Sequence, residues 1–235
     1  FGHRLSGSRA LERAIDWSIE QMKRDGLERA RREKVMVPRW VRGAERARVV
    51  APIERDLVLL GLGGTVGTGG RPLRGEIAVV ESLDEIARRG EALRGKIVVI
   101  NQAMPAFDHE HHHSGYGETV KIRSSGASEA AKVGAKAVLI RSVTANSLRS
   151  PHTGAVRYAE GVPKIPAAAL TLEDAELLAR LARRGAATVE LSLGAKTLSD
   201  SESANAIAEL RGRELPDEIV VIGGHIDSWD VGDGS

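Results

Sequence analysis

The sequence predicts an α/β fold built in two parts. Three patterns indicate it. A helix followed by strands opens the chain, strands and helices alternate from about residue 53 to residue 194, and a sequence pattern like that of the first part then follows to the end. The middle stretch holds enough apolar strands and helices to bury a core of its own. We therefore expect a domain that begins over residues 1–52, is interrupted by a second over residues 53–195, and resumes over residues 196–235.

The first part is expected to hold one helix and one hairpin. Apolar residues recur at helical spacing over residues 8–25, where Ser8 is a suitable N-cap and Gly26 a suitable stop. The members of this apolar face are Leu11, Ile15, Ile19 and Met22. Residues 34–41 and 46–51 favour strands and are joined by a short polar turn, which predicts an antiparallel hairpin.

The middle part is expected to contain two helices, at residues 118–133 and 172–183, among short apolar strands. In the last part, residues 203–210 and 218–222 favour strands and flank a Pro-Asp turn, which predicts a second hairpin. The expected strands of the middle part are residues 57–62, 76–80, 96–101, 137–141, 167–171 and 188–193.

Composition excludes several classes of function. The chain has no cysteine, so disulfides, thiolate metal ligands and a cysteine nucleophile are all excluded. Its formal charge is +2, and no basic stretch alternates with aromatic residues, which argues against nucleic-acid binding. No apolar run approaches the roughly 18 residues that a membrane span requires.

The most informative motif lies near the end of the chain. An apolar, β-branched run at residues 219–222 predicts a buried strand, and two glycines and then His225-Ile226-Asp227 follow it. Open α/β folds build their sites at the carboxyl edge of the sheet. Asp227 can accept the proton of one ring nitrogen of His225, which is the usual arrangement around a metal-bound histidine. Asp230 and Asp233 follow in the same glycine-containing loop and are expected to be turn or cap residues.

Residues 223–232 resemble the first metal motif of the co-catalytic zinc aminopeptidase and carboxypeptidase family. Further blocks along the chain resemble members of the same family, in the same order, and together they span most of the sequence. These blocks are residues 1–8, 35–43, 129–135, 139–143, 150–154 and 162–166.

The resemblance implies the N-terminal part of a zinc-exopeptidase α/β domain, interrupted by an inserted protease-associated domain. It implies two Zn²⁺ ions that share an activated water, with His225 as a metal ligand and Asp227 as the catalytic carboxylate that orients it. The remaining ligands and the general base are expected beyond residue 235, so this chain is expected to be an inactive fragment. The implied substrates are dipeptides or short peptides with free termini, and the implied enzyme is a secreted or periplasmic homodimer.

Two other functions remain open. The chain could be a non-catalytic protein-binding module built on a protease-associated domain. Alternatively, residues 109–113 match His-Glu-x-x-His, which binds zinc in proteases when it lies on a helix. Here Pro105 precedes the motif and Gly115 and Gly117 follow it, which predicts a polar loop. Arg141 and His152 could face a substrate cleft, although ion pairing or packing explains them equally well.

Overall fold

The computed structural model describes residues 1–232 and confirms a mixed α/β fold. The chain divides into two compact units. The first unit combines residues 1–40 with the residues from 197 onward, and the second unit is formed by Val41–Lys196. Residues 41–52, which the sequence assigns to the first part, therefore lie in the second unit.

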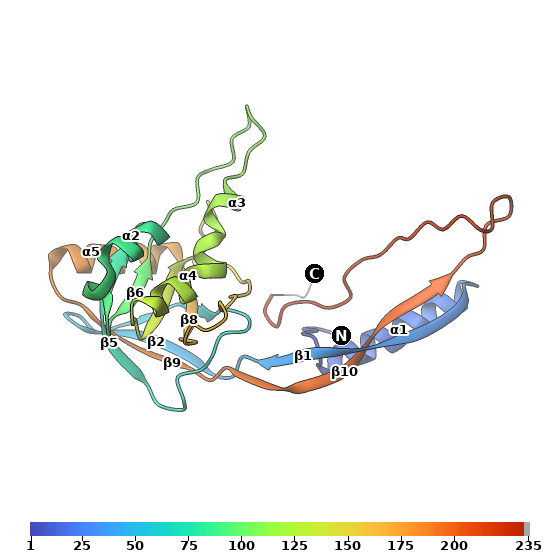
Figure 1. Cartoon of the computed structure of the whole chain (residues 1–235), viewed down its shortest axis with the longest axis horizontal. Helices are drawn as coiled ribbons and strands as arrows, with labels where there is room; N and C mark the ends of the chain where they lie inside the picture. The colour runs from blue at the N-terminus through green and yellow to red at the C-terminus, as the bar shows by residue number, and fades with distance from the viewer. Residues whose placement is uncertain (233–235) are drawn as a thin grey trace. The chain divides into compact units, whose positions relative to one another are not determined.

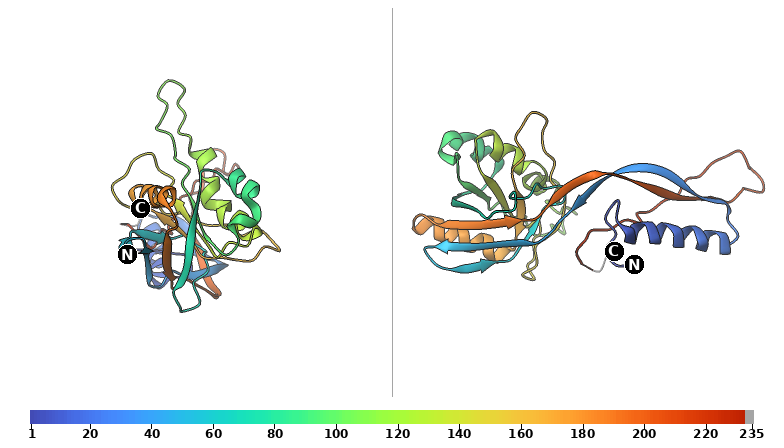
Figure 2. Two further views of the ribbon diagram at one scale, coloured as in Figure 1. Left: turned by 90° about the vertical axis from the view of Figure 1, so that its left-hand side faces the viewer. Right: turned by 90° about the horizontal axis from the view of Figure 1, so that it is seen from below.

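The first unit is built around helix α1 (Arg9–Arg24) and a two-stranded sheet of β1 (Glu28–Val41) and β10 (Lys196–Glu209) (Figure 2). The hydroxyl of Ser8 accepts the backbone N–H of Leu11, which confirms the predicted N-cap. The apolar face of α1 packs against β10. The buried residues of this contact are Leu11, Ile15, Ile19 and Ala204.

The second unit contains an eight-stranded sheet in the order β3-β2-β9-β5-β6-β7-β8-β4 (Figure 1). Strands β5, β6, β7 and β8 run parallel to one another, and all other pairs in the sheet are antiparallel. The strand bounds are β2 Glu45–Ala51, β3 Arg55–Leu57, β4 Leu59–Gly61, β5 Leu73–Val80, β6 Ile97–Ile100, β7 Ala137–Arg141, β8 Ala167–Leu170 and β9 Thr188–Leu193.

Helices cover both faces of this sheet. Helix α5 (Leu172–Arg184) packs on one face, while α2 (Leu83–Arg89) and α4 (Lys121–Lys132) pack on the other (Figure 2). Side chains alternate between the faces of a strand, so β6 contributes Ile97 and Val99 to the core under α5 and Val98 and Ile100 to the other core. A short helix, α3 (Tyr116–Thr119), precedes α4, and a 3-10 turn (Gly90–Leu93) follows α2.

Most of the predicted elements are present, but both predicted hairpins are wrong. Strand β1 pairs with β10, and β2 pairs with β9 and β3, so the first two strands do not pair with each other. Residues 219–222 form no strand, and each of their side chains is 85–91% exposed. A strand needs a neighbour to satisfy its backbone groups, and no strand of the described chain pairs with this segment.

Helix α2 was not predicted from the sequence, because its seven residues are too few to show a clear apolar period. It carries only one buried residue, Ile86, and its N-terminus is capped by the hydroxyl of Ser82. Within residues 1–232, no helix is both long and apolar enough to cross a membrane.

Truncation of a central core residue should destabilise the second unit. Leu139 is fully buried in the middle of the parallel sheet, so Leu139→Ala should lower the free energy of unfolding by about 2–5 kcal/mol through lost burial and the cavity left behind. Urea unfolding followed by far-UV circular dichroism measures this loss. Val35→Ala, at a side chain 40% exposed on β1, serves as the control and should change the free energy by about 0.5 kcal/mol or less.

Candidate functional site

The segment that carries the histidine motif is tied to the start of the chain. The backbone N–H of Ser228 donates to the carbonyl of Arg4 at 3.0 Å, and the backbone N–H of Arg4 donates to the Ser228 hydroxyl at 3.1 Å. The Arg4 side chain also donates from Nε to the carbonyl of Ile226 at 2.8 Å. Three hydrogen bonds therefore hold residues 226–228 in place although these residues form no helix or strand.

Hydrophobic packing fixes the same segment. The side chain of Ile226 packs against the apolar cluster between α1 and β10. Its neighbours differ, because the side chains of His225 and Asp227 are 92% and 41% exposed. One residue thus anchors the motif in the first unit, and the residues on either side of it are accessible to a ligand.

His225 and Asp227 contact each other directly. Nδ1 of the His225 ring lies 2.7 Å from Oδ1 of Asp227. A carboxylate can only accept a hydrogen bond, so this contact places the ring proton on Nδ1 and leaves the lone pair on Nε2 free to bind a cation. An imidazole oriented by a carboxylate in this way is typical of zinc ligands in proteins.

Within the described residues, the histidine motif is not part of a complete metal site. Among residues 1–232, no three His, Cys, Asp or Glu side chains are grouped so that they could hold a metal ion. Asp230 lies in a bend just after the motif, and Asp233 lies outside the described residues. Residues 219–222 do not form the strand that was expected to place His225 at a sheet edge. The contacts of Arg4 and Ile226 position the motif instead.

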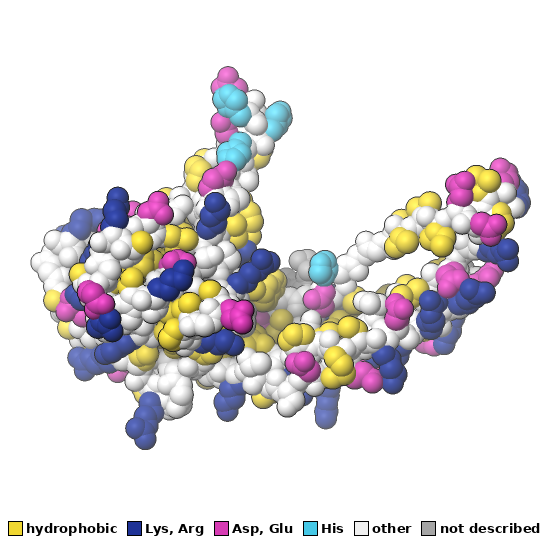
Figure 3. All heavy atoms as spheres, in the orientation of Figure 1, with side chains coloured by type: hydrophobic (Ala, Val, Ile, Leu, Met, Phe, Trp, Pro, Cys, Tyr) yellow, Lys and Arg dark blue, Asp and Glu magenta, His cyan; other side chains and the backbone are white. Residues whose placement is uncertain are grey.

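The histidine-rich stretch forms a loop, as predicted. Asp108 and His113 form an isolated antiparallel bridge, and α3 begins only at Tyr116. Histidine and acidic side chains gather at the tip of this loop (Figure 3). Nδ1 of His111 contacts the carboxylate of Asp108 at 2.8 Å, and Nε2 of His113 lies 3.4 Å from that of Glu118. Without a helix, His109 and His113 lack the one-turn spacing that the zinc-protease motif requires.

Arg141 forms an ion pair inside the second unit. It lies at the end of β7, and its guanidinium donates to the carboxylate of Glu176 on α5 and to the amide oxygen of Asn101. Next to this pair is a shallow cavity of about 340 Å³. Residues from α5 and from the loop between β7 and β8 line the cavity: Ser147, Leu172, Glu173, Glu176 and Arg180. The ion-pair interpretation of Arg141 therefore holds.

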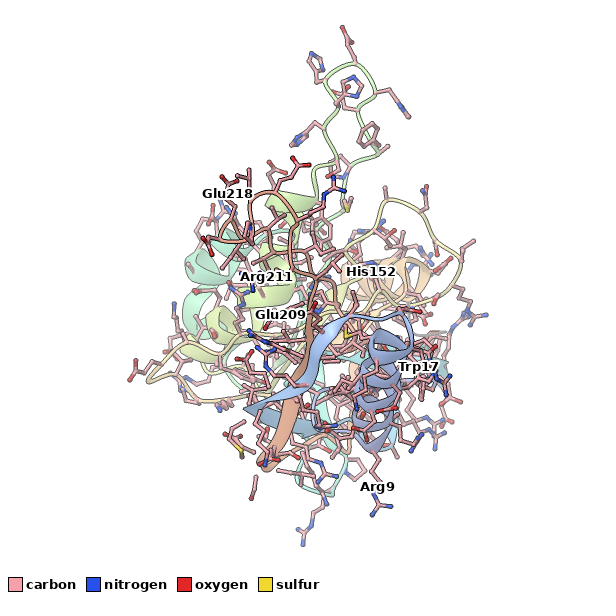
Figure 4. The ribbon with its side chains drawn as sticks, turned by 90° about the vertical axis from the view of Figure 1, so that its right-hand side faces the viewer. Arg9, Trp17, His152, Glu209, Arg211 and Glu218 are labelled. Atoms are coloured by element: carbon pink, nitrogen blue, oxygen red, sulfur yellow. The ribbon has the colours of Figure 1, made fainter. Side chains whose placement is uncertain are left out.

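A second polar cluster joins His152, labelled in Figure 4, to two residues that the sequence analysis did not single out. His152 lies beside Arg123, which in turn contacts Tyr116. Arg123 and His152 are 29 residues apart in the chain, so no local motif connects them. Only the fold brings these three side chains together.

Comparisons with known proteins agree with the predicted resemblance. No protein-family model matches the chain. Mouse carboxypeptidase Q is 46% identical over all 235 residues and rat carboxypeptidase Q is 48% identical, and in both cases the chain spans 48% of the relative's length. A peptidase M28 precursor from Shewanella amazonensis SB2B superposes with a TM-score of 0.90 at 38% identity, over 99% of this chain and 52% of that one. A zinc aminopeptidase from Bacillus subtilis, at 20% identity and a TM-score of 0.58 over 85% of this chain and 41% of that one, shares the fold.

The chain is therefore homologous, over its whole length, to the zinc exopeptidases of the M28 group. Its relatives at 46–48% identity are carboxypeptidase Q, which confirms the predicted resemblance to the co-catalytic zinc peptidases. The chain spans about half the length of these relatives.

The anchoring of the motif can be tested by amide hydrogen exchange. Ser228→Ala removes the hydroxyl that accepts the N–H of Arg4, so the amides of residues 226–228 should exchange about 5–10-fold faster, as expected for the loss of about 1 kcal/mol. The matched control is Ser201→Ala, because the Ser201 hydroxyl contacts only the carbonyl of the next residue. Equal exchange in the two variants would contradict the proposed anchoring.

Proposed function

We propose that this chain supplies the first metal motif of a zinc exopeptidase that hydrolyses dipeptides or short peptides with free termini. The observation that carries the proposal is the 2.7 Å contact between Nδ1 of His225 and Asp227, within a chain 46% identical to mouse carboxypeptidase Q. His225 is the proposed metal ligand. Asp227 is the proposed catalytic carboxylate that positions it.

Each of the two residues has a defined chemical task. His225 would bind zinc through Nε2, the ring nitrogen left without a proton. Asp227 keeps the proton on Nδ1, fixes the ring orientation and makes Nε2 a better electron-pair donor. When bound, zinc supplies a Lewis acid that polarises the peptide carbonyl and lowers the pKa of a bound water.

We further propose that the complete site holds two zinc ions and that the other ligands and the general base come from outside these 235 residues. Two observations support this. The residues described provide no group of three metal ligands, and the chain spans only 48% of its carboxypeptidase Q relatives. On this proposal the 235-residue chain has no hydrolytic activity by itself.

The second unit is the proposed protease-associated domain, inserted into the peptidase domain and shaping access to the substrate cleft. Its support is that Val41–Lys196 is a compact unit with its own two apolar cores, one on each face of its sheet. The secreted or periplasmic location and the homodimer remain predictions that come from the family resemblance alone.

A second candidate function is a non-catalytic module that binds protein through this second unit. The observation in its favour is the same independent core, since a domain that folds by itself can act without the metal motif. The two functions differ in whether His225 is needed, which makes them separable by experiment.

The first test replaces the proposed ligand in an extended protein that matches the full length of the carboxypeptidase Q relatives. His225→Ala should abolish zinc-dependent hydrolysis of a dipeptide. Asp227→Asn should reduce metal affinity or activity by about 10–100-fold, because it disturbs the orienting carboxylate but leaves the ligand in place. Initial rates and zinc content, measured before and after chelation, check both expectations.

The control for this test is the double variant His109→Ala and His113→Ala. These residues carry the zinc-protease pattern on an exposed loop, so their loss should leave the rate unchanged. If the loop variant were inactive and His225→Ala fully active, the metal motif would be the loop and the proposal would fail. Hydrolysis by the 235-residue chain alone would contradict the proposed division of the site.

A further inference from the structure

The cluster around Arg123 lies wholly in the second unit. Arg123 is in the first turn of α4, and Tyr116 is the first residue of α3. The guanidinium donates from Nη2 to the Tyr116 hydroxyl at 2.6 Å and from Nη1 to the carbonyl of Thr153 at 3.0 Å. Nη1 also lies 3.5 Å from Nδ1 of His152, a long contact, and the guanidinium carbon lies 5.6 Å from the centre of the Tyr116 ring.

Within residues 1–232, Arg123 forms no ion pair with a carboxylate. Every partner of this guanidinium among residues 1–232 is neutral: a phenol, a backbone carbonyl and an imidazole. Its Nε atom is buried and has no acceptor. Two other partly buried arginines differ, since Arg141 pairs with Glu176 and Arg32 pairs with Glu12. A partly buried cation is expected to have an anionic partner, because water no longer solvates it fully.

The side chain of Arg123 lies against Gly154. Gly154 has φ +155°, a conformation that favours glycine, and a Cβ built there would lie 2.3 Å from Nε of Arg123. The side chain of Arg123 therefore occupies the space next to Gly154, and its hydrogen bonds to the Thr153 carbonyl and the Tyr116 hydroxyl hold the guanidinium there.

Arg123 also determines which protons its neighbours present. An arginine can only donate, so the Tyr116 oxygen and Nδ1 of His152 act as acceptors, and their remaining protons, on the phenol and on Nε2, are free to donate. Partial burial, and then the charge of Arg123, lower the pKa of His152, which favours the neutral form of its ring. Both side chains are solvent-exposed, and no residue within 1–232 accepts either proton.

We propose that Tyr116, Arg123 and His152 form a binding site for a carboxylate. Two exposed donors, the Tyr116 hydroxyl and Nε2 of His152, would bind the two carboxylate oxygens, and the guanidinium behind them supplies the compensating charge. The single positive charge of Arg123, beside two neutral donors, balances the single negative charge of a carboxylate. The donor atoms also become stronger donors, because each accepts from a charged group. This site is independent of the metal motif and of the proposed hydrolysis.

The competing interpretation is purely structural: Arg123 ties α4 to the loop at Thr153 and binds no ligand. That interpretation explains the hydrogen bond to the Thr153 carbonyl. It does not explain why Tyr116 and His152 both present unused donors beside an arginine without an anion. Binding measurements separate the two interpretations, because a structural tie predicts no response to carboxylates.

The test follows the ring resonances of His152 by NMR in the 235-residue chain, labelled at histidine, while diglycine is added. The expected result is a saturable shift in the millimolar range with diglycine and none with diglycine amide, which lacks the carboxylate. Acetate and N-acetyl-aspartate amide form two further arms. A response to diglycine and acetate alone identifies a free terminal carboxylate, and a response to the aspartate compound identifies an acidic side chain of a protein. No response to any carboxylate, or an equal response to the amide, overturns the proposal.

The two tyrosines of the chain provide a matched pair of variants. Tyr116→Phe keeps the ring over Arg123 but removes the donor, so carboxylate binding should weaken by about tenfold or more, with an unchanged thermal unfolding midpoint. Tyr158→Phe removes a hydroxyl that donates to the buried carbonyl of Ile165, so it should lower the midpoint and leave binding unchanged. Arg123→Gln should abolish binding and raise the pKa of His152. Normal binding by Tyr116→Phe would contradict the proposed site.

Discussion

The pairing of two segments far apart in the sequence determines how this chain folds. Strand β1 pairs with β10 in the first unit, and β2 pairs in antiparallel fashion with β9 in the second unit. Because β10 returns to β1, the first unit is built from both ends of the chain. This pairing places β10 where α1 packs against it. It also brings the chain after β10 back to the first unit, where Ser228 bonds to Arg4.

The position of the histidine motif at residues 225–227 depends on the pairing of β10 with β1. Ile226 packs against the apolar cluster between α1 and β10, and hydrogen bonds with Arg4 hold the backbone of Ile226 and the backbone and hydroxyl of Ser228. This arrangement leaves His225 and Asp227 outside the core and in contact with each other. The geometry of the histidine–carboxylate pair therefore comes from long-range packing, although the two residues are only two positions apart in the sequence.

The sequence predicts features that depend on residues close together in the chain, and it fails for features that depend on distant residues. The Ser8 cap, the apolar strand expected at residues 96–101 and the loop around residues 109–113 each show in the local sequence, and the structure contains all three. The first predicted hairpin is wrong because β1 and β2 pair with β10 and β9, which lie far away in the chain. The second is wrong because no described strand pairs with residues 219–222. Residues 219–222 show the limit most clearly, since an apolar run predicts a strand only where another strand is available to pair with it. The Arg123 cluster gave no signal because its members are joined only by the fold.

The two histidines at the proposed sites show how a neighbour selects the ligand. At His225 a carboxylate accepts the proton on Nδ1, which leaves a lone pair on Nε2 that suits a cation. At His152 a guanidinium faces Nδ1, which places the proton on Nε2 and makes that atom a donor that suits an anion. A neighbouring negative charge thus suits a histidine ring to bind a cation, and a neighbouring positive charge suits it to bind an anion.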